Sequence, residues 1–158
     1  MKRLTSALAS CLLLAYSFAA PLALEHELLT FMNVARADAR YHAETQGLAH
    51  PLTWNAAVAE VALRHSEEMA RNHTLSHTSN RGLDVGQRLD AAGITWSSAG
   101  ENVALASSVE QVENMIMREP PFQANHRGNV LNRHFTEVGI GIARAGAQLY
   151  VTEDFLSH

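Results

Sequence analysis

The fold is decided by two β-prone runs near the end of the chain, Val138-Gly139-Ile140-Gly141-Ile142-Ala143 and Gln148-Leu149-Tyr150-Val151-Thr152-Glu153-Asp154-Phe155. Ala145-Gly146-Ala147 is a natural turn between them, so the three segments predict a β-hairpin. The chain before this hairpin shows mostly helical periodicity. Helices first and a hairpin late predict an α+β fold in which the two kinds of element are segregated.

Apolar residues recur at three- to four-residue spacing before the hairpin and predict several amphipathic helices. Gln46-Gly47 is expected to end the first of them, and Pro120-Pro121 the last long one. The predicted helices cover residues 25–45, 53–72, 81–92 and 109–118, with a strand over residues 100–105 and a short helix over residues 128–132.

The first residues have the layout of a secretory signal peptide. The basic pair Lys2-Arg3 precedes residues 4–20, which are uncharged and mostly apolar, and Ser17-Phe18-Ala19 supplies a small-x-small cleavage site. We therefore predict a cleaved signal over residues 1–23 and one mature domain over residues 24–158. The expected location is secreted, either periplasmic or extracellular.

Two alternatives stay open for this segment. Residues 4–24 approach the roughly 20 apolar residues that a bilayer requires, so the segment could stay uncleaved as a membrane anchor. Leu8-Ala9-Ser10-Cys11 also resembles a lipoprotein cleavage box. Cys11 is the only cysteine, so a mature domain without it has no disulfide and rests on apolar packing.

The charge balance of the chain is acidic. It carries 12 basic and 16 acidic residues, and loss of Lys2 and Arg3 leaves a mature net charge of about −6. A nucleic acid partner requires a basic face, so this composition argues against one. A metal or a small ligand stays compatible with it.

Three short motifs carry one carboxylate and two histidines: Leu75-Ser76-His77, Gly100-Glu101-Asn102 and His126-Arg127. Two imidazoles and one or two carboxylates suit a divalent-metal site, in which His77 and His126 would ligate zinc or a similar cation and Glu101 would hold a bound water. The alternative is a hydrogen-bonded network of the same side chains without a metal. A direct role in binding an organic ligand or in catalysis is the third interpretation.

In this order, the motifs resemble the CAP superfamily of cysteine-rich secretory proteins, antigen 5 and pathogenesis-related proteins. The similarity is closer to its bacterial, cysteine-free branch of secreted SCP-domain proteins, and it covers residues 25–155. Its six anchors are Leu52-Thr53-Trp54-Asn55, Leu75-Ser76-His77, Arg88-Leu89-Asp90-Ala91-Ala92-Gly93, Gly100-Glu101-Asn102, His126-Arg127 with Asn129-Val130-Leu131, and Val138-Gly139-Ile140-Gly141.

The resemblance implies a three-layer α-β-α sandwich around a mainly antiparallel sheet, with a cleft that collects two histidines and usually two glutamates. His77 and His126 match the histidine positions, and Glu101 matches the first glutamate. Glu119 stands where eukaryotic members carry the second glutamate, although residues 121–125 resemble an insertion at this point. Some members bind zinc or a similar cation between the histidines.

These observations predict a secreted protein whose cleft binds a divalent cation or a small extracellular ligand, such as a lipid or a cell-wall fragment. The alternative is a metal-assisted hydrolase of peptide or peptidoglycan bonds with Glu101 as the general base. The mature segment has no cysteine and no Gly-x-Ser-x-Gly elbow, so nucleophilic catalysis has little support. The sequence does not decide whether the protein is an enzyme and does not indicate an oligomeric state.

Four further residues are expected outside the site. His73 is predicted not to be a ligand, because it lacks the neighbouring glutamate of the zinc-protease motif. His134, eight residues after His126, is expected at the surface or in the layer behind the ligands. Arg127 and Asn129 are expected to be structural. We predict that Arg127 pairs with an acidic side chain and that Asn129 caps the short helix that follows.

Overall fold

A computed structural model describes residues 22–158 of the chain. The predicted signal over residues 1–23 lies almost wholly outside the described part, as does Cys11, so cleavage, lipidation and anchoring stay predictions. Within residues 22–158 no helix combines the length and the apolar character that spanning a bilayer requires.

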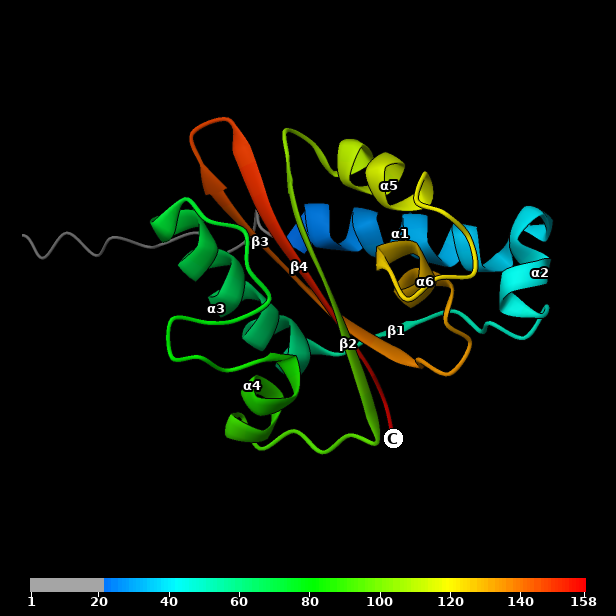
Figure 1. The fold of residues 1–158 in the computed structure, drawn as a ribbon, viewed down its shortest axis with the longest axis horizontal. Coiled ribbons are helices and arrows are strands. Elements are labelled where there is room, and N and C mark those ends of the chain that lie inside the picture. The colour runs from blue at the N-terminus through cyan, green and yellow to red at the C-terminus, as the bar shows by residue number, and fades with distance from the viewer. Residues whose placement is uncertain (1–21) are drawn as a thin grey trace, which may run out of the picture.

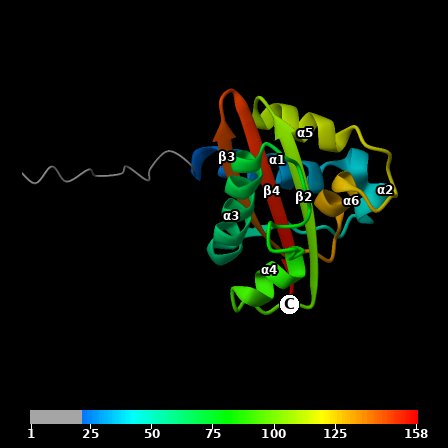
Figure 2. The same cartoon turned by 60° about the vertical axis from the view of Figure 1, so that its left-hand side comes forward.

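Four strands form one sheet in the order β1-β3-β4-β2. The predicted hairpin is present as β3 (Glu137–Ala145) and β4 (Gln148–Ser157). Strand β2 (Ser98–Ala106) pairs antiparallel with β4 along its whole length, and the two-residue β1 (Thr53–Trp54) pairs in parallel with β3. The sheet is therefore mainly antiparallel, with β2 at one edge (Figure 2).

Helices cover both faces of this sheet (Figure 1). One face carries α3 (Ala56–Asn72) and α4 (Val85–Ala91). The other face carries α1 (Leu22–Ala37), α5 (Val109–Met117) and α6 (His126–Leu131). The three-layer α-β-α sandwich is thus confirmed.

Each face of the sheet has its own apolar core. Between the sheet and α3 and α4, a small cluster forms around Val58, Val61, Leu89 and Leu156. On the other face a larger cluster joins α1, α5 and α6 to the strands through Leu28, Met32, Val112, Ile116, Val130, Val138 and Phe155. Because β4 is covered on both faces, its residues 149–156 are all buried and the strand lacks the alternating burial of a half-exposed strand.

The first predicted helix is divided into three pieces. Helix α1 ends at Ala37, and a short 3-10 turn η1 (Ala39–Tyr41) and α2 (His42–Thr45) follow it. Asp38 causes the break, because its carboxylate accepts a hydrogen bond from the backbone N–H of Arg40 and so starts a new turn. The predicted end is correct, since Gln46 and Gly47 both adopt positive φ.

The second predicted helix begins three residues later than expected. Thr53 and Trp54 form β1, because the backbone N–H of Thr53 donates to Thr136 and that of Asn55 donates to Val138. Asn55 then caps α3, its side chain accepting from the N–H groups of Ala57 and Val58.

Helix α3 lies against the backbone of β3 at two glycines. A Cβ atom added at Gly139 would come within 2.1 Å of the Ala59 nitrogen, and one at Gly141 within 2.1 Å of the Leu63 nitrogen. The hydroxyl of Ser66 also donates to the carbonyl of Gly141 at 2.8 Å. These contacts fix the distance between α3 and the sheet, and with it the start of the loop after α3.

We expect Gly141→Ala to lower the free energy of unfolding by about 3 kcal/mol or more, the upper end of the overpacking range, because the added methyl group meets helix backbone. Urea denaturation of both proteins measures the loss. Gly146→Ala is the control, since its φ is positive but no atom lies near the new methyl group, and it should cost only about 1–2 kcal/mol. Equal losses in the two variants would show that close packing at Gly141 is unimportant.

Candidate functional site

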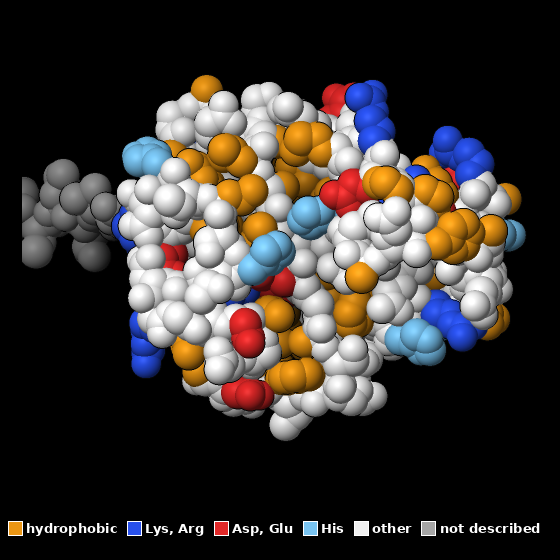
Figure 3. Space-filling view, viewed as in Figure 1, with side chains coloured by type: hydrophobic (Ala, Val, Ile, Leu, Met, Phe, Trp, Pro, Cys, Tyr) orange, Lys and Arg blue, Asp and Glu red, His pale blue; other side chains and the backbone are white. Residues whose placement is uncertain are grey.

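The four residues predicted for the site line one open cleft of about 480 Å³. His77 comes from the loop between α3 and α4, Glu101 from β2, Glu119 from the segment after α5, and His126 from the first turn of α6. The cleft therefore lies across the free edge of β2. Figure 3 shows two histidine side chains, each beside an acidic one, near the centre of this face.

Each histidine is paired with one glutamate. His77 Nδ1 lies 2.8 Å from Glu101 Oε1, and His126 Nδ1 lies 2.5 Å from Glu119 Oε1. The two imidazole rings are nearly parallel, with centroids 6.3 Å apart and an angle of 20° between their planes. Since the carboxylates occupy the Nδ1 atoms, each Nε2 is left without a hydrogen bond to any described residue.

Glu101 lies buried beneath His77 and is paired with an arginine. Its side chain is 3% exposed, and its Oε2 accepts a hydrogen bond from Arg88 of α4. Arg88 Nη1 also donates to the carbonyls of His77 and Leu83, so the same guanidinium holds the loop that carries His77. His65 of α3 completes this environment, with Nε2 3.8 Å from Glu101 Oε2.

Two asparagines join α6 to the edge strand. Asn129 Nδ2 donates to the Glu101 carbonyl at 3.1 Å and to Asn102 Oδ1 at 2.8 Å. Asn102 Nδ2 donates to the His126 carbonyl and to Glu153 Oε2. The expectation that Asn129 caps the short helix is wrong: Asn125 caps α6 by accepting from Gly128, which leaves Asn129 free to fix the edge strand.

The glutamate at position 119 is held from the start of α6. Its Oε2 accepts a hydrogen bond from the backbone N–H of Arg127. The side chain of Arg127 pairs with Glu44, which confirms the predicted pairing of this arginine with an acidic side chain. The intervening loop contains Phe122, which is 73% exposed and has a positive φ of 59°. Glu119 is thus tied to His126 by both side chain and backbone.

The two histidines predicted to lie outside the site do not line the cleft. His73 ends α3 in the left-handed conformation, and His134 lines a separate hollow with Arg133. Three neighbours of Glu101 were not predicted, namely His65, Arg88 and Asp154. A signal existed for His65, because it continues the buried helical stripe of Val58, Val61 and Ala62.

Buried carboxyl groups stand directly behind the cleft. In the β2–β4 pairing Glu101 lies opposite Asp154, and Asn102 lies opposite Glu153. Because neighbouring residues of a strand point to opposite faces, Asp154 and Glu153 lie on opposite faces of the sheet. Burial raises the pKa of Glu153 to about 8 and that of Glu113, on α5, to about 7. Burial, reinforced by the charge of Glu101, also raises the pKa of Asp154 well above its ordinary value. At neutral pH the protonated form of Glu153 is therefore favoured.

We expect Glu153 to make the fold less stable as the pH rises. Its ordinary pKa is 4.5 and its folded pKa is about 8, so between these values the folded state holds the extra proton and rising pH favours unfolding. Glu153→Gln stays neutral and keeps an acceptor for Asn102, so its free energy of unfolding should fall less between pH 4.5 and 8. Urea denaturation across this range tests the difference.

The matched control for this pH dependence is Glu110→Gln, an exposed position on α5. Its profile should follow that of the wild type. Parallel profiles for the wild type and Glu153→Gln would contradict a buried proton at Glu153.

The residues of the cleft fit a metal in part. Their donor set is two imidazole nitrogens, each backed by a carboxylate on the other ring nitrogen, which is the usual arrangement behind metal-bound histidine. No group of three or more His, Cys, Asp or Glu side chains in residues 22–158 is gathered as a metal site. A cation here would thus rest on His77 and His126, with its other ligands supplied from outside the protein.

The sequence model of the cysteine-rich secretory protein (CAP) family matches residues 29–155. The chain belongs to this family. It is 32% identical over 134 residues to the uncharacterized membrane protein YlbC of Bacillus subtilis, which covers 84% of this chain and 34% of YlbC. The chain thus spans about a third of the length of this relative.

Solved structures share the CAP fold. An extracellular protein of Bacillus anthracis that contains an SCP domain is 26% identical, with a TM-score of 0.69, and the match covers 84% of this chain and 40% of that one. NaASP2, crystallised with Zn²⁺, is 12% identical with a TM-score of 0.57, covering 84% of this chain and 78% of that one. The second likeness concerns the fold alone.

Proposed function

We propose that this CAP protein acts outside the cytoplasm as a binding protein whose cleft holds a divalent cation, zinc or a similar ion, on His77 and His126. The observation that carries the proposal is the state of the two rings: both Nδ1 atoms are engaged by carboxylates, and neither Nε2 atom has a hydrogen-bond partner among residues 22–158. A bound cation supplies a Lewis acid with open positions for a second ligand. That ligand is a small extracellular molecule, such as a lipid or a cell-wall fragment.

The surrounding residues support this role by fixing the rings before anything binds. Arg88 holds both Glu101 and the carbonyl of His77, and Arg127 N–H holds Glu119. The two side chains are therefore ordered already in the folded protein, so that binding a ligand removes less of their conformational entropy. The N-terminal signal layout and the extracellular B. anthracis neighbour support a location outside the cytoplasm. YlbC is named as a membrane protein, and a membrane-anchored form is compatible with the same location.

The geometry favours binding over hydrolysis. A general base must reach a water or a substrate proton, but both oxygens of Glu101 are occupied, by His77 and by Arg88, and its side chain is 3% exposed. Glu119, with a side chain 27% exposed, is the more accessible carboxylate. The hydrolase alternative therefore has less support.

We expect zinc to bind to purified residues 24–158 in titration calorimetry, and the affinity to fall at least about tenfold in His77→Ala and in His126→Ala, because each removes one of two protein ligands. His134→Ala is the matched control, since this exposed histidine lies outside the cleft. No heat with the wild-type protein, or unchanged heat in the double variant His77→Ala and His126→Ala, would refute the cation site.

We expect no turnover of peptide or peptidoglycan libraries by the zinc-supplemented protein above the level of Glu101→Gln, because Glu101 is not free to act as a base. Product release followed by chromatography measures this. Turnover by the wild type that Glu101→Gln abolishes would restore the hydrolase interpretation.

A further inference from the structure

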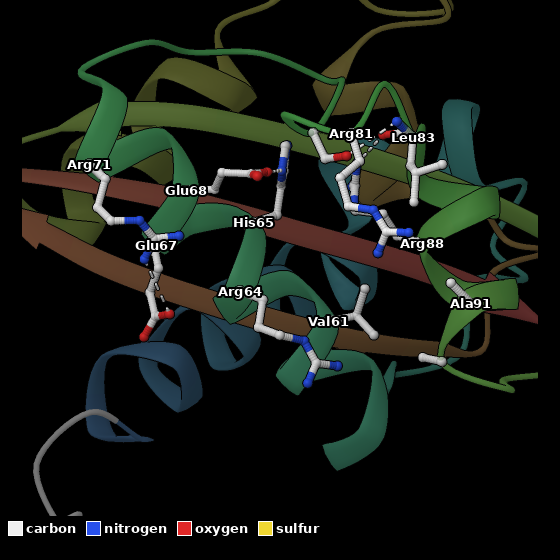
Figure 4. Close-up of a pocket in the computed structure, with 12 residues that line it drawn as sticks. Val61, Arg64, His65, Glu67, Glu68, Arg71, Arg81, Leu83, Arg88 and Ala91 are labelled. Atoms are coloured by element: carbon white, nitrogen blue, oxygen red, sulfur yellow. Dashed lines mark hydrogen bonds and ion pairs between the residues drawn. The ribbon is translucent and has the colours of Figure 1, made fainter.

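A hollow of about 590 Å³ lies between α3 and α4, and the charges on its walls offset one another. Figure 4 shows Arg71 beside Glu67 and Glu68 beside His65. This hollow therefore gives no preference for the charge of a ligand. A smaller hollow, beside α6, combines an exposed aromatic ring with side-chain amides and little charge.

The smaller hollow has a volume of about 280 Å³ and lies on a different side of α6 from the cleft. His126 and Asn129 of α6 line the cleft, whereas Gly128 and Leu131 line the hollow. Helix α2 forms another wall through Glu44, and Figure 1 and Figure 2 both show α2 beside α6. We call this space the α6 hollow.

Phe122 belongs to the loop between α5 and α6 and lines the α6 hollow. It is 73% exposed, so its ring gains little from packing against the protein. Its φ of 59° lies in the left-handed region, which residues other than glycine rarely adopt. Neither burial nor backbone preference accounts for a phenylalanine at this position, whereas contact of the ring with a ligand would account for it.

Hydrogen bonds hold the loop that carries Phe122 in this conformation. Asn125 Nδ2 donates to the Pro120 carbonyl at 2.9 Å, and Asn125 Oδ1 accepts from the Gly128 N–H at 2.8 Å. A side chain at Gly128 would collide with the carbonyl oxygen of Gln123, so the loop backbone packs directly on α6. Because the loop is fixed in this way, a ligand that contacts Phe122 orders little additional chain.

Unfavourable backbone conformations gather at the α6 hollow. Residues 22–158 contain three non-glycine residues with positive φ, and two of them, Gln46 and Phe122, line this hollow. The third, His73, ends α3. Residues in such conformations cluster at binding and catalytic sites, where the surrounding structure holds them in place. Their coincidence at one hollow supports a binding site there.

Side-chain amides form much of the polar lining. Gln46 Oε1 accepts from Arg133 Nη1, and Asn132 Oδ1 accepts from the backbone N–H of His134. These bonds use the amide oxygens and leave the NH₂ groups of Gln46 and Asn132 as donors without a partner among the described residues. Gln123 is exposed and adds a further amide, which both donates and accepts. The hollow thus offers several neutral hydrogen-bonding groups beside one aromatic ring.

The α6 hollow carries little charge. Glu44 is bonded to Arg127, so among the described lining residues only Arg133 has an uncompensated charge. A phosphate chain or another polyanion requires several basic groups and does not match this lining. A wholly apolar ligand does not match it either, because covering the amides without hydrogen bonds is unfavourable.

A pyranose ring matches the groups of the α6 hollow. Its hydroxyl groups both donate and accept hydrogen bonds, as the amides require. Its C–H bonds form an apolar face that can lie against an aromatic ring, whose negative face attracts the hydrogens. Amide side chains beside an exposed aromatic ring therefore indicate a saccharide.

We propose that the α6 hollow binds a glycan. One pyranose ring stacks on Phe122, and its hydroxyl or acetamido groups form hydrogen bonds with the amides of Gln46, Gln123 and Asn132. The volume of about 280 Å³ is small for a ligand site, so part of the glycan extends over the surface. This site goes beyond the proposed cation cleft, with which it shares no lining residue.

Titration calorimetry with the hexasaccharides of N-acetylglucosamine and of glucose tests the site. At least one of them should bind the wild-type protein. Phe122→Leu keeps an apolar side chain without a ring face and should weaken this binding about fivefold or more. Phe122→Trp provides a larger ring face and should keep the affinity within about threefold. The control is Val34→Ala, at an exposed apolar position outside the hollow, and it should keep the affinity within about twofold.

A second pair of variants tests the amides. Gln123→Ala should weaken hexasaccharide binding about threefold or more, because it removes hydrogen bonds to the sugar. The matched control is Gln148→Ala, at an exposed glutamine of β4 outside the hollow, which should change the affinity by less than about twofold. Equal affinities in the two variants would contradict a role for the Gln123 amide.

Phe122→Gly separates a role in binding from a role in folding. Glycine adopts positive φ without strain, so the midpoint of urea denaturation should stay unchanged or rise, while hexasaccharide binding should be lost. A phenylalanine that serves the fold alone would give a lower midpoint and unchanged binding. Retained hexasaccharide binding in Phe122→Gly overturns the proposal whatever the midpoint is.

The proposal is also overturned if the wild type binds neither hexasaccharide or if Phe122→Leu binds as tightly as the wild type. Retention of the wild type on phosphatidylcholine vesicles, abolished by Phe122→Gly and without hexasaccharide binding, would assign the ring to a lipid surface instead. The double variant His77→Ala and His126→Ala should lose zinc and keep its hexasaccharide affinity. Loss of hexasaccharide binding in this double variant would contradict a separate site, so the glycan site and the cation cleft can fail independently.

Discussion

The ion pair between Arg88 and Glu101 connects more of this molecule than any other polar contact described above. It joins α4 to β2, and the same guanidinium holds the loop that carries His77. Both partners are buried, so removing either one would leave an uncompensated charge in the interior, at a cost of about 3–5 kcal/mol. The position of His77, and hence the shape of the cleft, depends on this pair.

Much of the fold could be predicted because its signals are local. The hairpin of β3 and β4, the glycine turn between them and the end of α5 before Pro120-Pro121 each follow from a few neighbouring residues. Strand β1 could not be predicted, since a two-residue strand has no periodicity and forms only because β3 lies beside it. Arg36 is a similar case. It lies on a helix, yet it is buried because it donates to four backbone carbonyls distant in the sequence.

The candidate site was partly predictable for a different reason. His77, Glu101 and His126 were identified from short motifs and their order, and Glu119 from its place relative to a family pattern. The layer behind them was not, because Asp154 meets Glu101 only through the register of β2 and β4. Which residues stand beside a histidine can be inferred from motifs. Which carboxyl groups lose their solvent, and so favour the protonated form, depends on pairing across the sheet.

The hydrogen bonds from Asn129 have a consequence for self-association. Strand β2 has nine residues and lies at the edge of the sheet, and an unprotected edge of that length is a template for pairing with another chain. The Asn129 side chain occupies the Glu101 carbonyl on this edge, and α6 packs beside it. The opposite edge is closed by the short β1. The helix that carries His126 therefore also covers part of this strand edge. Changes that loosen the helix are expected to promote self-association through β2 as well as to alter the cleft.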